Sequence, residues 1–169
     1  MELSIKSFVL LGAVILTGLS AGLFYAWSVS VIPGTQNLGH SNYLTTMQSI
    51  NRAILNPAFY VVFFGSVLFL SIASIYEFNL DATAFWLILA SSICYLVGTI
   101  GVTGLGNVPL NNQLDVLKIT ELSSTKIAEF RAFYEQNWNR LHGIRTFCAV
   151  ISFVLAVLAL FAHVKTFKY

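Results

Sequence analysis

Residues 87–105 read LILASSICYLVGTIGVTGL, and this stretch decides the fold class of the chain. It holds no charged residue, and its length matches the roughly 20 residues that a helix needs to cross the hydrocarbon of a bilayer. Within lipid the segment must be helical, because a helix satisfies every peptide N–H and C=O internally. Three other stretches share this character, and we expect four membrane spans at residues 7–32, 57–76, 84–105 and 143–164.

The composition of the whole chain is that of a membrane protein. Of its 169 residues, 57% are hydrophobic and only 9% are charged, and the mean hydropathy is +0.77. A soluble domain carries about 25% charged residues. The net charge of +2 is small and dispersed, so we expect no nucleic-acid partner. We expect an integral protein of the bacterial inner (plasma) membrane, with its orientation left open because basic residues flank both ends of the predicted spans.

The spacing of the spans predicts an all-α fold, an integral membrane four-helix bundle that forms a single domain over residues 1–169. Two long connections, residues 33–56 and 106–142, lie on the same side of the membrane. Both contain apolar residues three and four positions apart, which predicts amphipathic helices lying against that end of the bundle. The stripes are Tyr43, Met47, Ile50 and Ile54, with Ser41 as a cap, and Ile127, Phe130, Tyr134, Trp138 and Leu141.

Residues 106–115, GNVPLNNQLD, follow the third span and carry three asparagines. Pro109 suits the first turn of a new helix, and Asn107 suits its cap or a turn. Capping leaves Asn111 and Asn112 unexplained, since asparagine is a poor residue inside a helix. We therefore expect Asn107 and Asn111 to face a pocket.

Residues 138–145, WNRLHGIR, place a second group of polar side chains at the start of the fourth span. Trp138, His142 and Arg145 fall on one face of a continuous helix, and Asn139 neighbours His142. Charged residues at the edge of a membrane are costly unless they face protein, water or headgroups. The group either anchors the helix at the interface or lines a functional site.

The sequence lacks the familiar patterns of metal and nucleophile sites, such as HExxH or CxxC. His40 and His142 are the only histidines expected on the same side, and they are an alternative pair of ligands for haem or a metal. Cys94 and Cys148 both lie in apolar stretches and are expected to be buried thiols. No cofactor is predicted.

Four stretches resemble the anthrone oxygenase-like family of small four-span membrane proteins. They are FYAWSVSVIPG, MQSINRAILNPAF, GNVPLNNQLD and WNRLHGIRT, and the resemblance extends over essentially the whole chain. The shared positions are Pro33, Asn51, Asn56, Pro57, Asn107, Pro109, Asn111, Trp138, Asn139, His142 and Arg145. All of them fall at the end of the bundle that carries the long connections.

The resemblance implies an oxygenase that oxidises an anthrone to an anthraquinone without a conventional cofactor. Such a site needs a base, donors for an enolate-type oxygen and a dry cavity. We expect His142 to be the base and Asn107, Asn111 and Arg145 to be the donors. The residues expected to contact a hydrophobic aromatic or phenolic substrate are Trp138, Asn139, Asn51, Asn56, Tyr25 and Trp27.

Two other functions fit the same sequence. One is a non-catalytic membrane protein that binds a small hydrophobic ligand, a lipid or a partner at the same end, with a homo-oligomer as a possible assembly. The other is a redox protein that holds haem or a quinone through His40 and His142.

Overall fold

The computed structural model describes residues 4–166, and every regular element within them is helical. The elements are α1 (Ile5–Ala26), a π-helical segment (Trp27–Val31), α2 (Ile32–Gln36), α3 (His40–Ala53), α4 (Pro57–Glu77), α5 (Ala82–Cys94), π-helical segments Tyr95–Gly101 and Thr103–Asn107, α6 (Val108–Asp115), a 3-10 turn (Ile119–Glu121) and α7 (Ser124–Thr166). Four helical stretches are long and apolar enough to cross a membrane, and they begin at Ile5, Pro57, Ala82 and Ser124. The predicted all-α, four-span architecture is confirmed.

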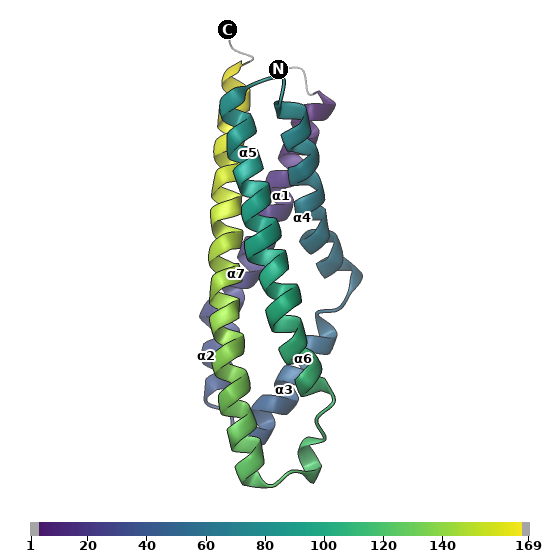
Figure 1. Ribbon diagram of the computed structural model, residues 1–169, viewed down its shortest axis with the longest axis vertical. Helices are drawn as coiled ribbons and strands as arrows, with labels where there is room; N and C mark the ends of the chain where they lie inside the picture. Colours follow the sequence, from purple (N-terminus) through teal and green to yellow (C-terminus); the bar gives the residue numbers. More distant parts are fainter. Residues whose placement is uncertain (1–3, 167–169) are drawn as a thin grey trace.

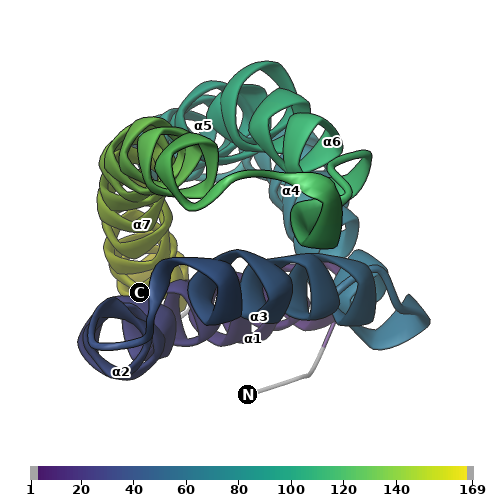
Figure 2. The ribbon, with the colours of Figure 1, turned by 90° about the horizontal axis from the view of Figure 1, so that it is seen from below.

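The four long helices lie side by side, with the small helices at one end (Figure 1). The start of α1, the end of α7 and the α4–α5 connection lie together at the opposite end. Figure 2 looks along the bundle from the end that carries α2, α3 and α6, where α3 runs across in front of α1. We call this end the α3 end. The predicted asymmetry between the two ends is confirmed.

Two of the membrane helices continue through a proline instead of ending there. The first helix was expected to stop near residue 32 and the third near residue 105, but they run on past Pro33 and Pro109. Proline lacks an N–H and collides with the carbonyl four residues earlier in an ordinary α-helix. In both cases a π-helical segment comes just before it, so that Ile32 N–H bonds to Trp27 O and Val108 N–H to Thr103 O. The wider turns let the helix pass the proline.

The helix α7 is one continuous element of 43 residues. At 1.5 Å per residue it is about 65 Å long, roughly twice the hydrocarbon thickness of a bilayer. Its first half therefore projects beyond the apolar part of the bundle. The stripe predicted in residues 127–141 faces a second core there, where Tyr134 and Trp138 are almost completely buried.

The second core joins α3 and α6 to α7. Its buried residues are Tyr43, Leu44, Met47, Leu110, Leu114, Ile119, Tyr134 and Trp138. The helix α3 begins at His40 after Gly39, so the expected cap at Ser41 is wrong. Its buried face includes Asn51, which introduces a polar side chain into this core.

In the main bundle, the π-helical segment Tyr95–Gly101 and α7 approach closely at a glycine. A Cβ on Gly98 would lie 2.3 Å from the Cys148 Sγ, so only glycine fits there. On α1, a Cβ on Gly18 would lie 3.0 Å from the Phe153 ring, whereas one on Gly22 would meet nothing within 4 Å. Of the GxxxG pair on this helix, Gly18 is therefore the one that makes a helix contact.

Candidate functional site

His142 lies at the centre of a buried polar cluster at the α3 end, and it is 1% exposed. Its ring stacks on the Trp138 ring with centroids 5.0 Å apart and an angle of 8° between planes. The Arg145 guanidinium approaches Nδ1 of His142 from Nε at 3.1 Å and from Nη2 at 3.0 Å. Because a guanidinium can only donate, Nδ1 must carry a lone pair.

The other ring nitrogen of His142 faces α1. Nε2 lies 3.1 Å from the carbonyl oxygen of Phe24, 3.0 Å from Oγ of Ser28 and 3.3 Å from Oγ1 of Thr146. The carbonyl can only accept, which assigns the proton of the ring to Nε2. His142 is therefore a neutral imidazole whose orientation is fixed from both α1 and α7.

Arg145 is a buried cation without a carboxylate partner. It is 8% exposed, and in the part of the chain that the structure describes no carboxylate lies within salt-bridge distance of it. Besides His142 it contacts Oγ1 of Thr103 at 3.4 Å, and its charge lies over the Phe24 and Trp138 rings at 4.7 and 5.1 Å. Neutral partners compensate a buried charge only in part. This arrangement favours binding of a group that carries negative charge.

Asn107 faces the same cluster and does not act as a helix cap. Its backbone is helical (φ −66°, ψ −40°), it makes no capping bond, and it is 0% exposed. Its Nδ2 donates to the Trp138 carbonyl at 3.2 Å, while its Oδ1 has no hydrogen-bond partner. The buried Nε1 of Trp27 also has none. An acceptor and a donor therefore remain unused beside the His142 ring, which lies 6.4 Å from that of Trp27.

Asn111 and Asn51 belong to a hydrogen-bonded chain that runs from α6 through α7 to α3. The Oδ1 of Asn111 accepts from Nε1 of Trp138 at 2.8 Å and from the Tyr134 hydroxyl at 3.0 Å. The Tyr134 oxygen in turn accepts from Nδ2 of Asn51 at 3.0 Å. Asn111 therefore contacts Trp138 and Tyr134, and Asn51 contacts Tyr134. The bonds of Asn111 use its oxygen as an acceptor, whereas the sequence suggested that this side chain would donate to a substrate.

Of three other predicted residues, Trp27 joins the cluster, whereas Tyr25 and Asn139 do not. Tyr25 is 59% exposed on the outer face of α1, away from the cluster that its neighbour Phe24 joins. Trp27 is half-buried and packs on Trp138, with ring centroids 5.8 Å apart. Asn139 is half-buried on α7 and stays outside these hydrogen bonds.

Asn56 serves α4 rather than the cluster. Its Oδ1 accepts from the Phe59 N–H at 3.0 Å and its Nδ2 donates to the Ala53 carbonyl at 2.9 Å. These bonds make it the N-cap of α4, immediately before Pro57. Asn56 is therefore the turn residue that was expected before the second span, and it does not join the cluster as a substrate contact would.

His40 does not accompany His142. It is exposed at the first residue of α3, whereas both nitrogens of His142 already have partners. Among the described residues, no group of three or more His, Cys, Asp or Glu side chains is placed to hold a metal ion.

Sequence reasoning missed four residues of the cluster: Phe24, Ser28, Thr103 and Thr146. Thr146 follows His142 by four residues, so its helical neighbourhood was visible in the sequence. Phe24 on α1 and Ser28 in the π-helical segment that follows it also lie four apart and share a face. Only the packing of α1 on α7 shows that this face meets His142.

Arg131 fixes the connection between α2 and α3 over the cluster. Its guanidinium donates to the carbonyls of Leu38 and, at 2.8 Å, Gln36, and to the Glu135 carboxylate at 2.9 Å. It also lies 4.4 Å above the ring of Tyr43. Burial, followed by the charge of Glu135, raises the pKa of Tyr43 well above its usual range, so that side chain is a neutral phenol.

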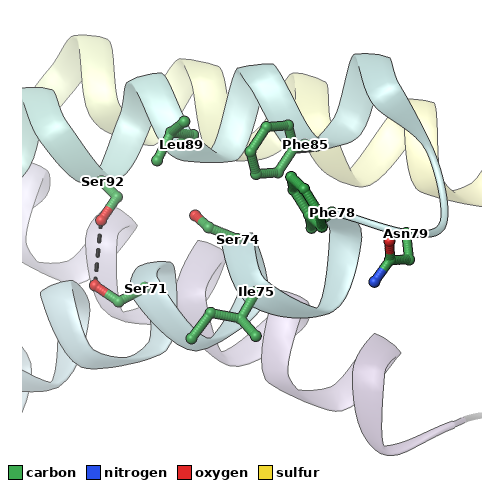
Figure 3. Close-up of a pocket in the computed structure, with 8 residues that line it drawn as sticks. All are labelled: Ser71, Ser74, Ile75, Phe78, Asn79, Phe85, Leu89 and Ser92. Carbon is green, nitrogen blue, oxygen red and sulfur yellow. Dashed lines mark hydrogen bonds between the residues drawn. The ribbon is translucent and has the colours of Figure 1, made fainter.

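Two grooves open on the surface of the bundle. The one in Figure 3 lies between α4 and α5, has a volume of about 430 Å³ and is lined by residues such as Ser71, Phe78 and Ser92, away from the α3 end. The other has a volume of about 520 Å³ and lies between the third helix and α7. Its wall includes Gly106 and Leu141, the residues immediately before Asn107 and His142. The second groove therefore borders the buried cluster.

Comparison with known proteins identifies the family. No curated protein and no solved structure matches the chain. The family described as anthrone oxygenase matches residues 46–155, which is more than half of the 169 residues and includes the cluster positions from Asn51 to Arg145. The chain therefore belongs to the anthrone oxygenase family.

Proposed function

We propose that this protein is a membrane-embedded oxygenase that acts on a small hydrophobic aromatic or phenolic substrate, in the bacterial inner membrane. The observation that carries the proposal is the contact between the buried Arg145 guanidinium and Nδ1 of His142. A cation without a carboxylate partner, beside a neutral imidazole, suits a reaction that develops negative charge on a substrate oxygen. The family name supports the same chemistry.

The groove beside Gly106 and Leu141 offers the substrate a route from the bilayer. Its wall is formed mainly by apolar residues, of which Val97 and Leu105 are 64% and 88% exposed. A Cβ on Gly106 would lie 2.8 Å from Cδ1 of Leu141, so this glycine leaves room for the leucine side chain at the wall of the groove. A rotamer change at Leu141 would connect the groove with His142.

The substrate oxygen would exchange places with the imidazole as the acceptor for Arg145. Once the guanidinium donates to that oxygen, the lone pair on Nδ1 of His142 is free to take a proton from the acidic carbon. The electron pair of the broken C–H bond moves onto the oxygen, which Arg145 stabilises as an enolate or phenolate. The unused Nε1–H of Trp27 would donate a further hydrogen bond to that oxygen, and the Trp138 ring would stack on a flat substrate. Asn107 is not the donor that the sequence suggested, because its Nδ2 already donates to the Trp138 carbonyl; its unused Oδ1 would accept from a phenol hydroxyl of the substrate.

The electron-rich carbanion would then reduce dioxygen without a resident cofactor. In the overall reaction a ring CH₂ and one O₂ give a ring carbonyl and one water. O₂ is the oxidant and the substrate carbon is oxidised. His142 accepts one of the two protons and returns it to the reduced oxygen. A purified preparation is expected to be colourless near 400 nm, and a Soret band there would contradict this part of the proposal.

Oxygen uptake tests the proposal directly. The purified protein in nanodiscs would be given 1,8-dihydroxyanthrone, with protein-free nanodiscs to measure autoxidation. Arg145→Gln should lose about 100-fold or more of the protein-dependent rate. Arg52→Gln is the matched control, because Arg52 pairs with Asp115 on the surface, where its side chain is 63% exposed. Binding of the anthrone without oxygen uptake would overturn the proposal in favour of a non-catalytic binding protein.

A further inference from the structure

A second polar cluster lies at the opposite end of the bundle, where three residues far apart in the sequence meet. Nδ1 of His163 is 2.8 Å from Oε1 of Glu77, and Nε2 of His163 is 3.2 Å from Oγ of Ser7. The three side chains come from α7, α4 and α1, and this end lies at the top of Figure 1. We infer that Ser7, His163 and Glu77 form an acyl-transfer triad that hydrolyses carboxylic esters at the membrane surface.

The acid and the base of this triad are both sheltered. The side chains of His163 and Glu77 are 3% and 1% exposed. Because the carboxylate accepts, Nδ1 of His163 carries a proton, and in the neutral imidazole Nε2 then has a lone pair toward Ser7. This is the tautomer that a general base needs when a serine is the nucleophile.

Glu77 is also suited to stabilise a protonated histidine. Its second oxygen, Oε2, is buried and has no hydrogen-bond partner. A buried carboxylate with one unsatisfied oxygen is poorly compensated while the imidazole is neutral. Positive charge on His163 during the reaction compensates it. Lys6 and Asp81 are the other charged side chains close enough to influence Glu77.

Ser7 is placed as a nucleophile would be. It is half-buried in the first turn of α1, and the Ser4 hydroxyl lies 3.1 Å from its Oγ. If Ser4 donates to that oxygen, the Ser7 proton is free to point at His163. The first N–H groups of a helix have no acceptor within the helix, and we assign those of Ile5 and Lys6 to the developing oxyanion.

The reaction balances without any redox partner. Ser7 Oγ forms a bond to the ester carbonyl carbon, the π electrons move to the carbonyl oxygen, and the hydroxyl proton moves to Nε2 of His163. The bond to the alcohol oxygen then breaks as His163 returns that proton to the leaving alkoxide. Water hydrolyses the acyl-serine by the same route, while Glu77 accepts the hydrogen bond from Nδ1 of His163.

The surroundings of Ser7 indicate the class of ester. Its helical neighbours Ile5 and Phe8 are 73% and 55% exposed on the outer face of α1. Apolar side chains exposed at the end of a membrane helix contact lipid, so the ester of an amphiphile at the bilayer surface is the substrate within reach. Ser7 and His163 lie outside residues 46–155, so this inference does not rest on the family or on the proposed oxygenase.

A fluorophosphonate probe tests the triad on the intact protein in nanodiscs. The probe should form a covalent adduct on Ser7, located by mass spectrometry of the peptides, and Ser7→Ala should abolish it. Ser30→Ala is the matched control, since Ser30 is an exposed serine near the other end of the same long helix. Glu77→Gln and His163→Gln should slow labelling by about 1,000-fold or more.

The labelling results can contradict the triad in two ways. A folded, monodisperse protein that is not labelled, or one labelled at a residue other than Ser7, overturns the inference. If a Glu77 or His163 variant fails to fold, Ser7→Ala still tests the inference, because it removes only the hydroxyl that would react with the probe. Oxygen uptake with the anthrone should be unchanged in Ser7→Ala, so failure of the triad and failure of the oxygenase give different results.

Discussion

Arg145 donates to Nδ1 of His142 from two of its nitrogens, at 3.1 and 3.0 Å. This contact links the two roles expected from the sequence, a base at His142 and a hydrogen-bond donor at Arg145. The only basic nitrogen of His142 is engaged by the group that would stabilise the substrate anion. In the proposed mechanism this nitrogen is the base, so Arg145 blocks it in the free protein and an arriving substrate oxygen would release it.

The first prediction concerns the tautomer of His142. In protein labelled with ¹⁵N-histidine, the His142 ring should give the NMR shifts of a neutral imidazole protonated at Nε2, because Arg145 donates to Nδ1 and the Phe24 carbonyl accepts from Nε2. His142→Gln identifies the signal. Shifts typical of an imidazolium or of the Nδ1–H tautomer would contradict the assignment.

The second prediction compares two adjacent asparagines. Asn111→Ala should lower the free energy of unfolding by about 1–3 kcal/mol, because the Tyr134 hydroxyl and the Trp138 Nε1 both lose the oxygen to which they donate. Asn112→Ala should have little effect, since Asn112 is exposed. Reversible unfolding in mixed micelles measures both. Equal losses for the two variants would count against the hydrogen-bonded chain.

The third prediction concerns close packing of the π-helical segment Tyr95–Gly101 on α7. Gly98→Ala should destabilise the bundle by about 1–3 kcal/mol, because its Cβ would lie 2.3 Å from the Cys148 Sγ. Gly104→Ala is the control, since a Cβ there meets nothing within 4 Å, and it should leave stability unchanged or raise it. The melting temperatures of the two variants in detergent decide the matter; a Gly98→Ala protein as stable as Gly104→Ala would show that the contact relaxes freely.

The fourth prediction tests the route from the bilayer. Leu141→Trp fills the groove beside Gly106 and should raise KM for the anthrone about 10-fold with little change in kcat, since it hinders entry rather than chemistry. Leu158→Trp places the same ring on the outer surface of α7, where the leucine is 46% exposed, and should leave both constants unchanged. A fall in kcat at constant KM for Leu141→Trp would argue against this entrance.

Much of the fold could be predicted because the hydrophobic pattern and the lengths of the connections determine it. The four spans and the side that carries the polar motifs followed from these alone. The ends of the first and third helices could not be predicted in this way, because Pro33 and Pro109 look like helix boundaries in the sequence. The π-helical segments that carry the chain past them depend on backbone hydrogen bonds that no single residue specifies.

Some residues of the candidate site could likewise be predicted from the sequence, and others could not. Asn111, Trp138, His142 and Arg145 could be placed together because helical spacing and topology bring them to one face and one end. Tyr25 was placed wrongly among the inward-facing residues because its rotation about the helix axis is set by packing, which buries Phe24 instead. The direction of the His142 lone pair depends on the positions of individual donors, and helical spacing carries no information about it.

The most direct test of the account is incorporation of ¹⁸O from ¹⁸O₂ into the quinone formed from 1,8-dihydroxyanthrone by the purified protein. The account predicts one ¹⁸O in the new carbonyl, formed at a rate that exceeds that of protein-free nanodiscs and that His142→Gln lowers by about 100-fold or more. Formation of the quinone at the same rate without the protein, or undiminished by His142→Gln, would contradict it.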